Sequence, residues 1–175
     1  MQYVDVASRL LLLTVFALAL AGKVSSRRAW SEFVESIRAM AVLDAPKVRP
    51  AAAATAVAEA GVIVLAVIPL RWAGSAAFVL AAGLLGCLTV AVATVVRRGA
   101  AVPCRCFGAS ETPLGVPHVV RNLVLVATAL LGLAASLVSG SFDVGLCVVV
   151  AVFGAALGLL MARWDDLVSL LRVAP

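Results

Sequence analysis

Five apolar segments, each long enough to cross a lipid bilayer, constrain what this chain can fold into. They cover residues of about 6–22, 51–70, 74–96, 119–139 and 142–162. Because a helix rises 1.5 Å per residue, about 20 apolar residues cross a hydrocarbon core about 30 Å thick. With 64% hydrophobic and only 13% charged residues, the 175-residue chain has no resemblance to a soluble domain. We therefore expect an all-α, polytopic transmembrane helical bundle of the cell membrane, folded as a single domain over residues 1–175.

The first segment has a second interpretation. Arg9, the apolar run after it and the triplet Ala19-Leu20-Ala21 also resemble a secretory signal peptide with a small-residue cleavage site. Against cleavage, Asp5 accompanies Arg9 before the run, and the residues that follow are strongly basic, which opposes export. A retained first helix is the favoured interpretation.

A polar stretch follows, and residues of about 28–43 are predicted to form an amphipathic helix at the membrane interface. Its apolar residues recur at helical spacing: Trp30, Phe33, Val34, Ile37, Met40 and Ala41. Because proline is tolerated in the first turn of a helix but not in its interior, Pro46 and Pro50 should end this helix and begin the next. The second span is therefore expected to start at residue 51.

The basic residues predict an orientation. Of the fourteen Lys and Arg residues, all but Arg9 and Arg71 fall on one side of a five-span arrangement. The positive-inside rule places that side in the cytoplasm and the N-terminus outside. Cleavage of the first segment would invert the arrangement. No basic run is interleaved with aromatic residues, so we expect contacts with lipid headgroups and no nucleic-acid partner.

The polar hinge at 99–118 carries Cys104 and Cys106, one residue apart. The cation of Arg105 favours the thiolate, which is the reactive form. A disulfide between these cysteines would close a small ring, and strained disulfides exchange readily. Phe107 and Gly108 then indicate a turn anchored at the interface. We predict a redox centre, against the alternative of a structural, permanently reduced pair.

The two other cysteines are interpreted as small packing residues. Cys87 and Cys147 lie inside apolar segments at depths that differ by roughly 12 Å, beyond the reach of about 7 Å between the Cα atoms of a disulfide. A structural zinc site needs four ligands, whereas Cys104, Cys106 and His118 supply three, so no metal site is predicted. A Cu(I) site with two thiolates is harder to exclude.

Charged residues within the spans are a further signal. Glu59 lies near the middle of the second span, where a carboxylate costs roughly 2.5–3.5 kcal/mol or more. It is either protonated or paired inside the bundle, or it acts directly in function. Arg121, followed by Asn122 at the start of the fourth span, either pairs with Glu59 or stabilises a thiolate. In the fifth span, Gly154 and Gly158 share one helical face and predict close helix packing.

Together these residues resemble the MauE family of methylamine utilisation membrane proteins, which is related to the DoxX-like group. The resemblance covers most of residues 6–140 and rests on positions spread over four spans: Lys23, Glu59, Gly61, Arg98, Gly99, Cys104, Cys106, Phe107, Gly108, Leu114, Gly115, Arg121 and Asn122. The Cys-x-Cys-Phe-Gly motif and the Arg-Asn pair are the more specific parts.

The resemblance implies a four-helix core, to which this chain adds a fifth helix. It implies a role in forming disulfides in, or maturing, an exported enzyme such as methylamine dehydrogenase, beside a thioredoxin-like partner. Cys104 and Cys106 would exchange electrons, supported by Arg105, Phe107, Gly108, Arg121, Asn122, Glu59 and Lys23. No motif demands a cofactor, and a quinone is a candidate electron acceptor. The alternatives are a membrane scaffold without catalytic activity and a small-solute or metal carrier, so enzymatic activity is a hypothesis.

Overall fold

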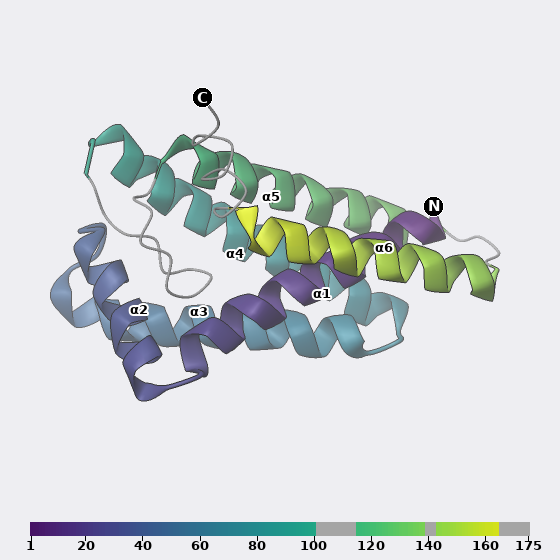
Figure 1. Cartoon of the computed structure of the whole chain (residues 1–175), viewed down its shortest axis with the longest axis horizontal. Coiled ribbons are helices and arrows are strands. Elements are labelled where there is room, and N and C mark those ends of the chain that lie inside the picture. The colour runs from purple at the N-terminus through teal and green to yellow at the C-terminus, as the bar shows by residue number, and fades with distance from the viewer. Residues whose placement is uncertain (101–114, 139–142, 165–175) are drawn as a thin grey trace, which may run out of the picture.

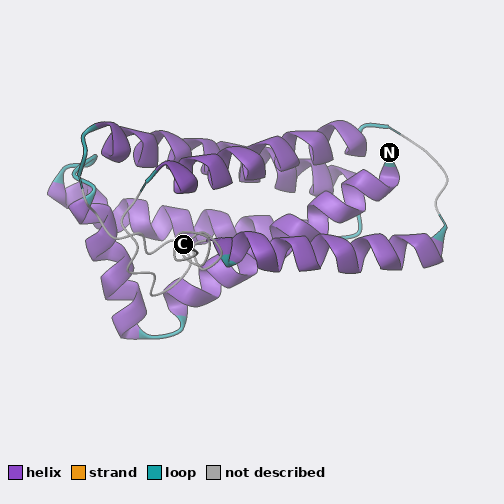
Figure 2. Ribbon diagram, turned by 45° about the horizontal axis from the view of Figure 1, so that its top comes forward, coloured by secondary structure: helices purple, strands orange, loops and turns teal. Residues whose placement is uncertain are grey.

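The computed structural model describes residues 1–100, 115–138 and 143–164. Within these ranges all regular structure is helical, as expected, and Figure 2 shows no strand there. The helices are α1 (Gln2–Val24), α2 (Arg27–Ala39), α3 (Ala45–Val67), α4 (Arg71–Arg97), α5 (Val116–Ser136) and α6 (Val144–Ala162). Figure 1 shows α1, α3, α4, α5 and α6 running lengthwise, with α2 at one end.

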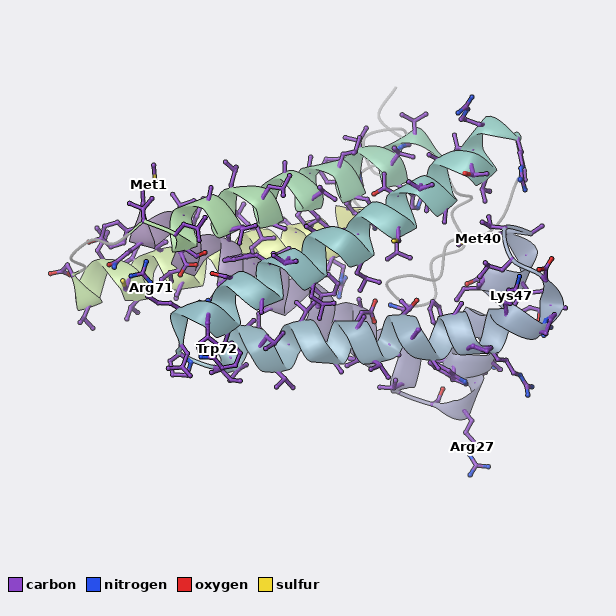
Figure 3. All side chains as sticks on the ribbon, turned by 180° about the vertical axis from the view of Figure 1, so that it is seen from behind. Met1, Arg27, Met40, Lys47, Arg71 and Trp72 are labelled. Carbon is purple, nitrogen blue, oxygen red and sulfur yellow. The ribbon has the colours of Figure 1, made fainter. Side chains whose placement is uncertain are left out.

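Five of these helices are long and apolar enough to cross a membrane, namely α1, α3, α4, α5 and α6. The chain is thus a multi-pass membrane protein. Figure 3 labels both ends of the bundle: Arg71 and Trp72 lie near Met1 at one end, and Lys47 lies near Met40 at the other. We call these the Arg71 end and the Lys47 end.

The core is built around α1. The main apolar cluster takes four residues from this helix, Leu11, Leu12, Val15 and Phe16, and adds residues of α3, α4 and α5 such as Val62, Phe78 and Leu125. α1 is therefore a central element of the packed bundle.

Two predicted boundaries were wrong because local residues allow the helices to extend. α3 begins at Ala45, with Pro46 in its first turn and Pro50 inside the helix. Pro50 has no N–H to donate to the carbonyl of Pro46, but both prolines are exposed at the start of the helix, where that carbonyl can be hydrated. α4 begins at Arg71 rather than 74, with Leu70 as its N-cap, and Pro69 separates it from the end of α3.

The two helices that border the hinge have well-defined ends. Gly99, with φ of 66°, follows the C-cap of α4, and its N–H donates to the carbonyl of Val96 at 3.1 Å. Glycine adopts this left-handed conformation without steric cost, so it stops the helix. α5 begins at Val116, three residues before the predicted 119. His118 therefore belongs to the first turn of α5 rather than to the hinge.

The amphipathic segment forms α2, shorter than the predicted 28–43. Ser26 caps it by accepting a hydrogen bond from the N–H of Ala29 at 3.0 Å. The buried side of α2 carries Phe33 and Val34, which pack with Val48 and Ala52 of α3. One face of α2 is thus fixed against the bundle, and the opposite face carries charged residues.

Helix α6 crosses α1 at two glycines, as the sequence predicted. Gly154 and Gly158 are the buried residues of α6. A Cβ atom on Gly154 would collide with the backbone of Ala7, and one on Gly158 would lie 2.7 Å from the carbonyl oxygen of Leu11. The absence of side chains lets the two backbones touch, which is how small residues stabilise helix pairs in lipid.

We expect Gly154→Leu or Gly158→Leu to separate α6 from α1 and to lower the free energy of unfolding by about 1–3 kcal/mol or more, as overpacking does. Gly83→Leu is the matched control, because nothing lies within 4 Å of a Cβ atom there. Denaturant titration of the purified variants in detergent measures the effect. Equal stability of the three variants would contradict the close helix crossing.

Candidate functional site

The hinge cysteines lie outside the described residues, and so do Arg105, Phe107 and Gly108. The described chain leads into the hinge at Ala100 and out of it at Gly115. The end of α4 and the start of α5 are therefore covalently joined to the Cys-x-Cys motif. Both lie at the end of the bundle opposite to the start of α4 (Figure 1).

A buried ion pair joins α1 to α3. The Nζ atom of Lys23 lies 2.7 Å from Oε1 of Glu59, and each residue is only 2% exposed. Lys23 occupies the last turn of α1, and Glu59 lies fourteen residues after the first residue of α3. The expectation of a paired carboxyl inside the bundle is confirmed.

The ammonium of Lys23 has two further contacts that hold it in place. It donates to the carbonyl oxygen of Ala19 at 3.3 Å, and it lies 5.0 Å from the centroid of the Phe33 ring. That ring comes from α2, so the amphipathic helix caps the site with a cation–π contact. Good geometry with additional contacts is what a buried ion pair needs to offset the loss of hydration.

The ion pair borders a small internal cavity of about 20 Å³. Its polar lining comes from four residues, Lys23, Thr55, Glu59 and Asn122, and its apolar lining includes Phe16 and Leu85. This volume suffices for about one water-sized molecule, which requires polar partners of this kind. Asn122, the second residue of the Arg-Asn pair, thus faces the same cavity as Glu59.

The start of α5 brings further polar side chains into the interior. His118, Arg121 and Asn122 are 4%, 1% and 5% exposed. The Nδ1 atom of His118 accepts a hydrogen bond from the N–H of Gly115 at 3.3 Å, and so caps the first turn of α5. Three polar residues within five positions are therefore buried directly after the hinge.

Glu59 has a cation partner that the sequence analysis did not name. Lys23 forms an ion pair with it, whereas Arg121 was the cation that the sequence offered. Coupling between Arg121 and Glu59 stays a prediction. The contacts of Lys23 with Glu59 and Phe33 were missed, and the available signal was a lysine closing one apolar segment and a glutamate inside the next.

Cys87 and Cys147 are both free thiols. Their interpretation as packing residues was wrong for Cys87, which is exposed on α4, and Cys147 is half-buried and lines a cavity at the Arg71 end. Among the residues that the structure describes, no three His, Cys, Asp or Glu side chains are grouped so that they could hold a metal ion. The Cu(I) alternative depends on the hinge cysteines and is untested.

The family model of methylamine utilisation protein MauE matches residues 1–135. The match includes α1 to α4, the hinge and nearly all of α5, and α6 lies beyond it. No curated protein and no solved structure is a significant match to the chain.

Proposed function

Because the chain belongs to the MauE family and is a membrane protein linked to methylamine utilisation, we propose that it is a thiol–disulfide redox protein that assists disulfide formation in an exported enzyme. Methylamine dehydrogenase is the candidate substrate, and a thioredoxin-like protein is the candidate partner. Cys104 and Cys106 are the proposed redox pair.

The observation that carries this proposal is the group of buried polar residues next to the hinge. An isolated charge at bilayer depth is costly, and charged residues kept there usually mark a functional site. Here Lys23, Glu59 and Asn122 surround one small cavity. Asn122 lies only seven residues after Gly115, the first described residue beyond the Cys-x-Cys motif. The polar site and the Cys-x-Cys motif are thus closely linked along the chain.

The proposed cycle balances as follows. A thiolate of the partner attacks a disulfide between Cys104 and Cys106, so that a mixed disulfide forms as the hinge bond breaks. The second thiol of the partner then displaces the hinge, which leaves the partner oxidised and the hinge with two thiols. Two electrons and two protons have passed to the hinge. A membrane quinone accepts them, becomes a quinol and restores the hinge disulfide.

Thiol labelling tests both the redox state and the orientation of the pair. The test protein carries Cys87→Ser and Cys147→Ser, which leaves only the hinge cysteines. A maleimide that cannot cross membranes should label them in inverted vesicles and not in intact cells, because the basic residues predict a cytoplasmic hinge. Labelling should fall after mild oxidation with diamide and return after reduction, because a disulfide has no reactive thiol.

Labelling that neither reagent changes would contradict a redox-active pair. Labelling in intact cells would instead overturn the orientation and leave the redox chemistry in place. It would put the hinge on the exported side, where an exported substrate is directly accessible. The two parts of the proposal therefore fail separately.

A further inference from the structure

A second polar site lies at the Arg71 end, far from the ion pair of Lys23 and Glu59. A cavity of about 330 Å³ lies between the start of α1, the α3–α4 turn, the end of α5 and α6. Its polar lining comes from Gln2, Asp5, Arg9, Arg71 and Ser136. The proposed thiol exchange makes no use of this cavity.

The two arginines at this cavity are held by backbone carbonyls. Nη1 of Arg9 donates to the carbonyl oxygen of Ile68 at 3.2 Å, and Nη2 of Arg71 donates to that of Ser136 at 2.9 Å. Nη2 of Arg9 also lies 3.8 Å from a carboxylate oxygen of Asp5. These contacts fix two cations and one anion around the cavity, so the site has an excess of positive charge.

Three buried polar atoms in the lining have no hydrogen-bond partner among the described residues. They are Nε of Arg9, Oδ1 of Asp5 and Oε1 of Gln2. The first is a donor, and the other two are acceptors when Asp5 is ionised. Buried groups without partners destabilise a protein. A ligand that both accepts and donates hydrogen bonds would satisfy all three.

The position of the cavity indicates where such a ligand comes from. Val6, Leu70 and Val138 add apolar walls. Trp72, 63% exposed, lies beside Arg71 at the same end of the bundle (Figure 3). Exposed tryptophan and arginine at the end of membrane-spanning helices mark the level of the lipid headgroups. A ligand with a polar head and an apolar body can therefore enter from the bilayer.

We propose that this cavity binds the headgroup of a phospholipid whose phosphate is followed by a hydrogen-bond donor. The phosphate oxygens accept hydrogen bonds from Arg9 and Arg71, since guanidinium groups match phosphate geometry. The ammonium of phosphatidylethanolamine, or a hydroxyl of phosphatidylglycerol, donates to Asp5 and Gln2. Phosphatidylcholine carries the same phosphate but no donor, so it should bind more weakly.

Gly74 keeps the arginine in position. A Cβ atom on Gly74 would collide with the guanidinium of Arg9. Gly74→Ala should therefore displace Arg9 without removing its charge. Arg9→Gln removes the charge, and the two variants together separate placement of the cation from its presence.

Cys147 gives a direct readout, because its half-buried thiol lines the cavity. The full-length protein with Cys87→Ser, Cys104→Ser and Cys106→Ser keeps it as the only cysteine. In detergent, short-chain phosphatidylethanolamine and phosphatidylglycerol should slow its reaction with a maleimide about tenfold at saturation. A hydrogen bond to a charged group corresponds to about a tenfold change in affinity. Phosphatidylcholine should therefore need about tenfold more lipid for half-protection.

The same assay on variants tests the residues. Arg9→Gln and Gly74→Ala should each raise the half-protecting lipid concentration about tenfold or more. Arg28→Gln is the matched control, since it removes an exposed arginine at the other end of the bundle and should leave the protection unchanged. The lipid comparison uses no lining-residue variant, so the proposal stays testable if those variants fail to fold.

Several outcomes would overturn the proposal. Lack of protection by every lipid would reject a headgroup site. Equal protection by phosphatidylcholine would reject the role of Asp5 and Gln2. Protection by glycerol 3-phosphate at the same concentrations would show that a free phosphate compound, and not a lipid, is the ligand.

Discussion

Glu59→Gln is expected to lower the free energy of unfolding by about 3–5 kcal/mol, because it removes one partner of a buried ion pair and leaves the ammonium of Lys23 in the interior. Lys23→Met should cost a similar amount, since it leaves the carboxylate of Glu59 at bilayer depth. Titration of the purified proteins with sodium dodecyl sulfate measures the loss.

The double variant Lys23→Met, Glu59→Gln should recover much of this loss, because neither charge of the pair is left buried without the other. A matched control is the exposed ion pair of Arg28 and Glu32, with a separation of 2.9 Å. Arg28→Gln should cost less than about 1 kcal/mol, as surface ion pairs do. Additive effects of the two single substitutions at the buried pair would contradict the coupling between them.

A second double-mutant cycle, on Arg121 and Glu59, tests the sequence prediction that these two residues are coupled. A coupling energy for Arg121 and Glu59 close to that for Lys23 and Glu59 would show that both cations share the carboxylate. A negligible coupling energy would assign Arg121 to another role at the start of α5.

If the proposed function holds, Cys104→Ser and Cys106→Ser should each abolish the maturation of the proposed exported substrate. Both cysteines are needed, because one forms the mixed disulfide with the partner and the other resolves it. One single variant should also accumulate a mixed disulfide with the proposed thioredoxin-like partner, since its resolving thiol is missing. Complementation of a strain that lacks the protein measures activity, and non-reducing electrophoresis detects the trapped complex.

Cys87→Ser is the matched control for these variants, because Cys87 is a free, exposed thiol on α4. It should retain full activity and trap nothing. The hinge variants should unfold at the same denaturant concentration as the unmodified protein, since a polar loop adds little apolar packing. Full complementation by the double Cys→Ser variant would reject the redox proposal and favour the scaffold alternative.

The fold was largely predictable, because hydropathy fixes the number of helices that cross a membrane. All five spans are present, and the glycines of the fifth mark its crossing with α1 as expected. Helix ends were less predictable. The rule against interior proline placed the start of the second span at 51, but Pro50 is tolerated near the exposed start of α3.

The candidate site was predictable only in its residue types. Glu59 is conspicuous in a span, and Lys23 is prominent at the end of another. Their contact depends on the rotation and relative depth of α1 and α3, which hydropathy does not determine. Phe33 shows the same limit, since its spacing predicts an apolar face on α2 but not the ammonium that lies over its ring.

The position of both charged sites on α1 has a consequence for synthesis. Arg9 donates a hydrogen bond to the carbonyl oxygen of Ile68, which lies 59 residues later in the chain. Lys23 donates to the carboxylate of Glu59, which lies 36 residues later. The first helix is therefore made before either contact exists. α1 is apolar enough to cross a membrane by itself, but its two long-range polar contacts can form only once the chain through Ile68 has been made. The polar contacts of the first helix are thus completed after it has been made, when the third helix packs beside it.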